Sequence, residues 1–184
     1  KPNTTYTITL NLKSLDGARF EKDITYSVRT FKQDLAVEPR GFIINDDGSV
    51  SMMAIVSTAD KAKVEDIQKC FTSSASSTNV VELEANRFQV EFVFKQGMNS
   101  STQITYDGSS LGSDTKGEVP IFEVDQSNFT VVHTQHDPTN KEFKVYFSQR
   151  INPDVDLTGL VNVNNTNAKL NIQSNVLTLY LSDL

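Results

Sequence analysis

The sequence predicts an all-β protein built from β-sandwich modules, with one short helix. Apolar and polar residues alternate in short runs along most of the chain, which is typical of strands with one buried face. Turn signals separate these runs, as in sandwich folds. A single segment instead has apolar residues at helical spacing.

The first two strands are expected to form a hairpin. In the run TYTITLNL, residues 5–12, every second residue is apolar, and Asp16–Gly17 follows as a turn. ITYSV, residues 24–28, repeats the alternation with Ile24, Tyr26 and Val28 on one side. Each strand therefore presents one apolar face.

The clearest strands come from the middle of the chain. GFIIN runs into Asp47–Gly48, and SVSMMAIV resumes the alternation, which together indicate a second hairpin. Its second strand and the run RFQVEFVF each place four residues on one face: Val50, Met52, Ala54 and Val56, and then Phe88, Val90, Phe92 and Phe94. Further strands are predicted at 103–106, 128–132, 142–147, 169–172 and 175–181.

One helix is expected within residues 60–71. Val64, Ile67 and Phe71 recur at three- and four-residue steps, and Asp60 is placed to act as the N-cap. The serine-rich residues 73–78 should form a loop.

Composition argues against several classes of function. The net charge is −6, the pI is about 4.9 and no basic run is present, so nucleic acid is not an expected partner. One cysteine, Cys70, excludes an internal disulfide. The N-terminal residues KPNTTYTITL lack the pattern of a signal peptide, and we expect the chain to be a processed or excised piece of a longer protein.

The motif HTQHD contains both histidines. His133, His136 and Asp137 supply metal-ligand chemistry, but a spacing of three in a strand or loop points the rings to opposite faces. No third or fourth ligand is identifiable, and the motif is interpreted as a solvated hairpin loop.

Cys70 has the side-chain chemistry of a catalytic nucleophile. It follows the predicted helix, whose C-terminal dipole disfavours a thiolate, and neither histidine is near in sequence. We interpret it as a small, partly buried packing residue.

Some of the acidic residues occur in predicted Asp–Gly turns, and the others are scattered along the chain. Asp46, Asp47, Asp107, Asp114 and Glu118 have the side-chain chemistry of a calcium or glycosidase site. INDDGS fails the alternating carboxylate pattern of a calcium loop, and Asp–Gly turns account for positions 47 and 107. No catalytic, cofactor-binding or metal-binding residue is therefore predicted, and the chain is not expected to be an enzyme.

The order of several weak motifs resembles bacterial α2-macroglobulin-like proteins. These motifs are NFTVV, then EFKVYFSQRINPDVDLTGLVNV with Asp156, Leu157, Gly159 and Leu160, then NVLTLYL. Upstream, TADKAKVEDIQKCF and ITYDGSSLG resemble the short helix and the closing turn of a macroglobulin-type module. The resemblance is strongest from about Gln33 to Leu160.

The resemblance implies Ig-like, macroglobulin-type modules. Residues 1–35 would be the C-terminal part of a preceding Ig-like module, 36–123 a macroglobulin-type β-sandwich module with the short helix, and 124–184 the truncated start of a further Ig-like module. Phe143, Val145 and Phe147 are expected to form a core face that Leu157, Leu160 and Val161 continue.

The resemblance also implies a function. Family members are protease traps, in which cleavage of a bait segment triggers a shape change and exposes a Cys–Gln thioester. Cys70 lacks the C-x-E-Q context, so no reactive residue carries over and the chain would be scaffold. Proteases would be partners of the full-length protein only, beside other modules of the same chain. The location would be periplasmic or at the cell envelope, with a lipid anchor.

Two alternatives stay open. An Ig-like adhesin or accessory module of a glycan-handling surface protein would need an exposed aromatic platform, and the chain has no tryptophan and five tyrosines. A small hydrolase would need a cleft that joins the carboxylates or the histidines.

Overall fold

The structure is a computed structural model that describes residues 3–18, 22–95, 97–157, 161 and 168–181. It is mostly β, and the all-β prediction with one short helix is confirmed. The strands are β1 (Thr5–Leu10), β2 (Ile24–Arg29), β3 (Leu35–Ile44), β4 (Val50–Thr58), β5 (Phe71–Ser73), β6 (Ser77–Glu84), β7 (Arg87–Phe94), β8 (Ile104–Asp107), β9 (Lys116–Glu118), β10 (Val131–Asp137), β11 (Glu142–Phe147), β12 (Ala168–Gln173) and β13 (Val176–Leu181).

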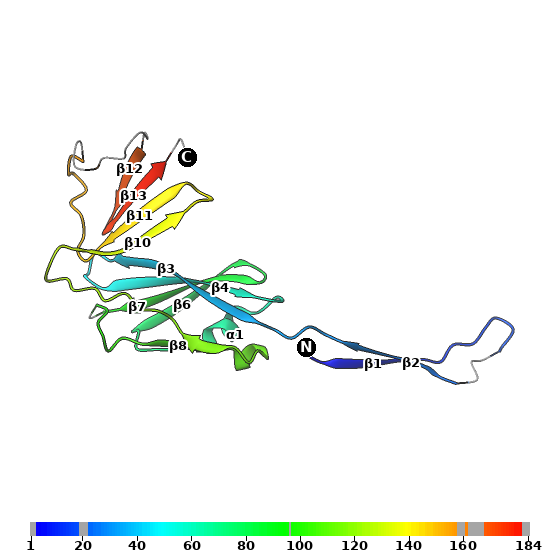
Figure 1. Ribbon diagram of the computed structural model, residues 1–184. Coiled ribbons are helices and arrows are strands. Elements are labelled where there is room, and N and C mark those ends of the chain that lie inside the picture. The colour runs from blue at the N-terminus through cyan, green and yellow to red at the C-terminus, as the bar shows by residue number, and fades with distance from the viewer. Residues whose placement is uncertain (1–2, 19–21, 96, 158–160, 162–167, 182–184) are drawn as a thin grey trace.

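The strands form three structural parts (Figure 1). β1 and β2 make a two-stranded hairpin, here called the arm, that extends away from the rest of the molecule. A four-stranded sheet, β3-β4-β7-β6, and a three-stranded sheet, β5-β8-β9, form the central sandwich. β10, β11, β13 and β12 form the C-terminal sheet, which stands against β3. All strand pairs are antiparallel.

The core of the central sandwich lies where the alternation predicts it. All eight apolar residues predicted for β4 and β7 are at most 4% exposed. Phe71 of the three-stranded sheet packs edge-on against Phe92, with ring centroids 5.3 Å apart, and Ile104 of β8 is buried. The two sheets therefore share one apolar interior.

The helix is shorter than predicted. α1 spans Val64–Lys69 and buries Ile67, while Phe71 belongs to β5. The N-cap position is Lys63, and the prediction that Asp60 caps the helix is wrong. Asp60 lies before the helix, where its backbone N–H donates to Oε1 of the buried Gln33 at 2.7 Å.

Three short or polar strands were not predicted: β5, β6 and β9. β6 is an edge strand, so its sequence STNVVELE carries polar residues that hide the alternation. The predicted serine-rich loop is confirmed only at residues 74–76, because Ser73 ends β5 and Ser77 begins β6.

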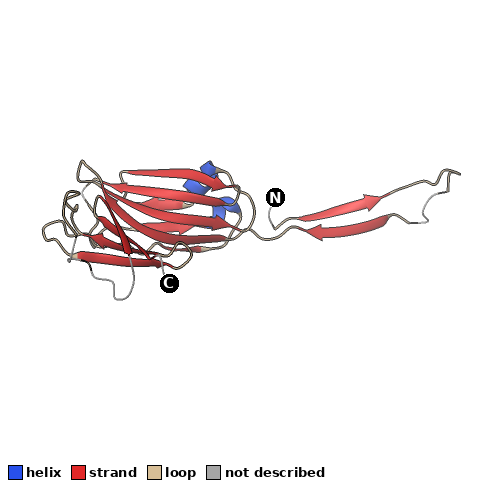
Figure 2. Ribbon diagram, turned by 90° about the horizontal axis from the view of Figure 1, so that it is seen from above, coloured by secondary structure: helices blue, strands red, loops and turns tan. Residues whose placement is uncertain are grey.

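The arm has the predicted hairpin pairing, with Tyr6 opposite Val28, Ile8 opposite Tyr26, and Leu10 opposite Ile24. Viewed from above, it remains apart from the body of the molecule (Figure 2). Its apolar face is therefore exposed, with Ile8 at 48% and Tyr26 at 56%.

Candidate functional site

The two histidines lie on strand β10 and face different surroundings. His133 is half-buried, and its ring centroid is 4.6 Å from that of Phe122 and 5.5 Å from that of Tyr146. Burial lowers the pKa of His133. His136 is exposed. The interpretation of HTQHD as a solvated hairpin loop is wrong, because the motif belongs to strand β10 and the His133 ring packs against Phe122 and Tyr146.

Cys70 is buried and held in place by hydrogen-bonding groups. Its Sγ lies 3.3 Å from the Asp66 carbonyl oxygen and 3.1 Å from Oγ of Ser110. Burial raises the pKa of the thiol, and the neighbouring acids Asp107 and Asp66 act in the same direction. The thiolate is therefore disfavoured. Cys70 is more completely buried than the sequence indicates, at 2% exposed.

The five acidic candidates are divided between two regions. Asp46 and Asp47 occupy the β3–β4 turn, where Arg150 pairs with Asp46 at 2.7 Å and Asp47 Oδ1 accepts from the Ser49 backbone N–H. The turn role predicted for Asp47 is confirmed.

Asp107, Asp114 and Glu118 lie at and between β8 and β9. Asp107 caps the 3-10 helix Gly108–Leu111 by accepting from the Ser109 backbone N–H at 2.9 Å. Lys116, 2.7 Å away, and Ser109 together lower the pKa of Asp107 to about 2. Asp114 pairs with Lys32. Among the described residues, no group of three histidine, cysteine or acidic side chains is arranged to hold a metal ion.

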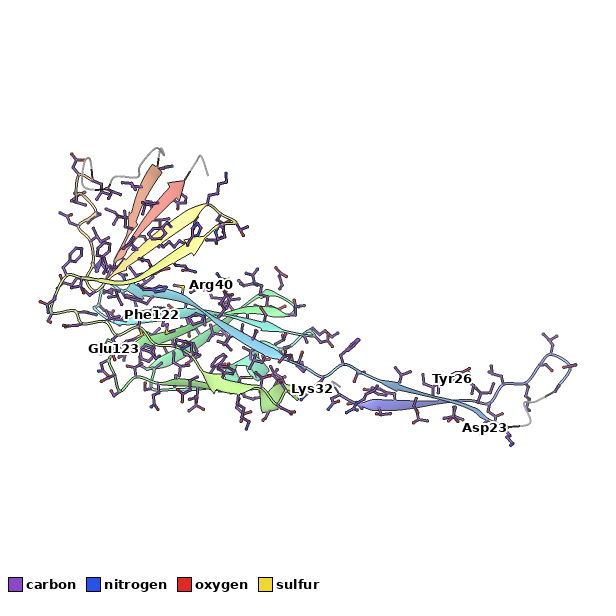
Figure 3. All side chains as sticks on the ribbon, viewed as in Figure 1. Asp23, Tyr26, Lys32, Arg40, Phe122 and Glu123 are labelled. Carbon is purple, nitrogen blue, oxygen red and sulfur yellow. The ribbon has the colours of Figure 1, made fainter. Side chains whose placement is uncertain are left out.

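The strongest constellation of polar and aromatic groups joins the C-terminal sheet to the central sandwich. Here β3 has a bulge between Pro39 and Gly41, and Gly41 has a φ of +100°. The Tyr146 ring lies against Gly41 so closely that an added Cβ would come within 2.5 Å of the Tyr146 Cε1 and Oη atoms. Tyr146 Oη donates to the carbonyl of Arg40 at 3.0 Å. Arg40 and Phe122 both lie at this junction (Figure 3).

A second contact closes the same junction at the end of β3. Asn175, in the turn between β12 and β13, is fully buried. Its Oδ1 accepts from the Ile44 backbone N–H at 2.8 Å, and its Nδ2 donates to the Phe147 carbonyl at 3.0 Å. Ser174 donates to the Ile44 carbonyl at 2.5 Å. These contacts and those of Tyr146 define what we call the joint.

An apolar groove lies on the C-terminal sheet. Phe147, Leu157 and Val161 line it together with Phe129, Ile172 and others, around a volume of about 480 Å³. The prediction that these residues form one continuous core is confirmed only in part: Phe147, Leu157 and Val161 come together as the lining of this groove, while Phe143, Val145 and Phe147 are half-buried. Tyr146 and Val176 of this sheet belong to the core shared with the sandwich. Leu177 and Leu179, the cross-strand partners of Val145 and Phe143, are also buried. Leu160 lies outside the described residues.

The joint is the feature that sequence reasoning missed. Tyr146 contacts Arg40, 106 positions earlier, and Asn175 contacts Ile44, 131 positions earlier. Two local signals point toward it: a glycine inside the strand at Arg40–Gly41, which is typical of a bulge or of close backbone approach, and the polar Ser174–Asn175 turn.

The comparisons with known proteins returned no matching family model, curated protein or solved structure. In the described part of the chain, no helix has the length and apolar character needed to cross a membrane.

Proposed function

We propose that this chain is a non-catalytic scaffold within a protease-trapping protein of the bacterial α2-macroglobulin type, located in the periplasm or cell envelope with a lipid anchor. A trap of this kind must hold its β-modules in fixed relative positions until a protease cuts it. The chain would supply that rigidity, and other parts of the full-length protein would capture the protease.

The observation that carries the proposal is the joint. A flexible linker between β-units makes few contacts, and domains so linked move independently. Here a buried asparagine and a tyrosine packed on a glycine connect the C-terminal sheet to strand β3 through directed hydrogen bonds. Buried, fully paired polar groups of this kind specify one orientation. The order of sequence motifs from Gln33 to Leu160 supports the family.

A protease-trapping assay tests the proposal. The full-length protein that contains this chain is incubated with trypsin, and cleavage of a large protein substrate is compared with cleavage of a small peptide amide. A trap encloses the protease, so large-substrate cleavage should fall at least tenfold while peptide cleavage persists. The isolated chain should inhibit neither reaction. Unimpaired cleavage of both substrates with clean digestion of the full-length protein would overturn the proposal.

Variants of the joint connect the assay to this chain. Asn175→Ala in the full-length protein removes the contact to Ile44, whereas Asn171→Ala changes an exposed residue two positions before the end of β12. Trapping should weaken in the first variant and remain unchanged in the second. Equal trapping by the two variants would show that the joint does not contribute to trapping.

One observation favours the adhesin alternative. Phe129 is 54% exposed and stacks on Phe147, with ring centroids 4.9 Å apart and planes 4° apart. An exposed aromatic face of this kind can stack against a sugar ring. Binding of the isolated chain to a glycan array, lost in Phe129→Ala, would support this function over the scaffold.

A further inference from the structure

His133 is the ionisable member of a cluster of rings at the joint. Its ring centroid lies 4.6 Å from that of Phe122 and 5.5 Å from that of Tyr146. Phe42 of strand β3 completes the cluster, with its centroid 5.5 Å from that of Phe122 and 5.6 Å from that of Tyr146. Phe42 and Tyr146 are both buried in the shared core. The cluster therefore connects strands β10 and β11 of the C-terminal sheet to the interior of the sandwich.

The surroundings of His133 favour the neutral ring. The residue is half-buried, and among the described residues no hydrogen bond reaches either of its ring nitrogens. A protonated ring carries a charge and two N–H donors, all of which need water or an acceptor. Burial accordingly lowers the pKa of His133 from its ordinary value of 6.5.

Other titratable groups lie on the elements around His133. They are Glu38 and Arg40 of β3, Glu123 beside Phe122 (Figure 3), His136 and Asp137 of β10, and Glu142, Lys144 and Tyr146 of β11. Glu38 pairs with Arg40 at 2.9 Å. Glu142 pairs with Lys144 at 3.1 Å, and Asp137 accepts from Asn140. Within the described ranges no ion pair joins any of these groups to His133, so none is a counter-ion for its protonated ring.

We propose that His133 makes the joint sensitive to acid, so that protonation of its ring loosens the contact between the C-terminal sheet and the sandwich. A proton binds more readily where water surrounds the ring, and protonation therefore favours molecules in which the cluster has opened. The contribution of the neutral ring is present above about pH 6.5 and is lost as the pH falls below that value. The inference concerns the joint itself and does not require the chain to be part of a protease trap.

A nuclear magnetic resonance titration of the His133 ring tests the first step. Its midpoint in the native protein should lie below its midpoint in denaturant, because water surrounds the ring fully only in the denatured chain. His136→Phe leaves His133 as the one histidine and so assigns its signals. A native midpoint equal to or above the denatured one would overturn the proposal, and cation–π attraction by Phe122 and Tyr146 would produce that result.

Hydrogen exchange of the Ile44 amide measures the joint directly. This N–H donates to Asn175 across the joint at 2.8 Å, so it exchanges when the joint opens. After correction for intrinsic exchange rates, its protection should fall between about pH 7.5 and about pH 5. Well below both midpoints, the factor should equal the antilogarithm of the difference between the denatured and native midpoints of His133. The amide of Val90, in the central strand β7, should keep its protection.

Two matched variants identify the group that takes up the proton. His133→Phe keeps a ring in the cluster but cannot be protonated, and His136→Phe makes the same change at an exposed position of β10. The pH dependence of Ile44 protection should disappear in the first variant and persist in the second. Circular dichroism at neutral pH checks that both are folded.

Two exchange results would contradict the proposal. Equal pH dependence in both variants would show that another group takes up the proton. An equal loss of protection at Ile44 and Val90 would show that acid unfolds the whole protein instead of opening the joint. If His133→Phe does not fold, the titration of His133 and the comparison of these two amides in the wild type still decide.

Discussion

Replacing Gly41 with alanine should destabilise the protein at the joint, and the structure gives two separate reasons. The first is backbone strain, because a φ of +100° is unfavourable for a residue with a Cβ. The second is a collision, because the new methyl group would come within 2.5 Å of atoms of the Tyr146 ring. Strain costs about 1–2 kcal/mol and overpacking about 1–3 kcal/mol, so the expected loss is about 2–5 kcal/mol.

Gly48 provides the matched control. Its φ is +80°, but an added Cβ there would have no atom within 4 Å. Gly48→Ala should therefore lose only the strain contribution of about 1–2 kcal/mol. Urea unfolding followed by circular dichroism measures both free energies of unfolding, and the difference between the variants isolates the collision with Tyr146.

A double-mutant cycle then identifies the collision partner. Tyr146→Leu shortens the ring that the new methyl group meets, so Gly41→Ala should cost about 1–3 kcal/mol less in that background. The reasoning fails if Gly41→Ala costs no more than Gly48→Ala, or if the two substitutions at the joint are additive.

Three further predictions concern single residues. Asn175→Ala should lower the free energy of unfolding by about 2–4 kcal/mol, because it leaves the buried Ile44 N–H and the partly buried Phe147 carbonyl without their partner. The exposed Asn171→Ala should cost under about 0.5 kcal/mol; urea unfolding measures both losses, and equal losses would contradict the assignment. Cys70 should react with a thiol reagent many times more slowly in the native protein than in denaturant, since its thiol is buried and its pKa is raised; rapid native labelling would refute this. The pKa of Asp107 is lowered to about 2 in the folded state, so its contribution to stability is present above about pH 4 and is lost as the pH falls from about 4 to 2. In Asp107→Asn the free energy of unfolding should therefore decrease less steeply over this pH range, and an unchanged pH dependence would contradict the assignment.

The strands that are easiest to predict from the sequence are those in which one face is fully buried. β4 and β7 lie in the middle of their sheet, so every second residue must be apolar, and the pattern is read without error. β6 lies at an edge of the sheet, and Glu82 and Glu84 interrupt its alternation of apolar and polar residues. The predicted cap at Asp60 failed for another reason: a buried Gln33 side chain holds the backbone there in a non-helical conformation.

The candidate site was harder to predict because its contacts are long-range. Alternation around Tyr146 indicates a strand, but not that its ring would rest on a glycine of another sheet. The same limit applies to the arm. Periodicity predicted its apolar face correctly, yet periodicity describes one strand at a time and does not say which layer covers that face.

The joint has a consequence for aggregation. β3 is an edge strand of its sheet, and free N–H and carbonyl groups along such an edge can recruit strands from other molecules. Side chains occupy this edge at two points, Tyr146 at the Arg40 carbonyl and Asn175 with Ser174 at Ile44. An incoming strand would have to displace them. β6, at the opposite edge, is approached by helix α1, where Gln68 Nε2 donates to the Thr78 carbonyl at 3.4 Å. Side chains therefore occupy part of both edges of this sheet, which should limit strand addition at either one.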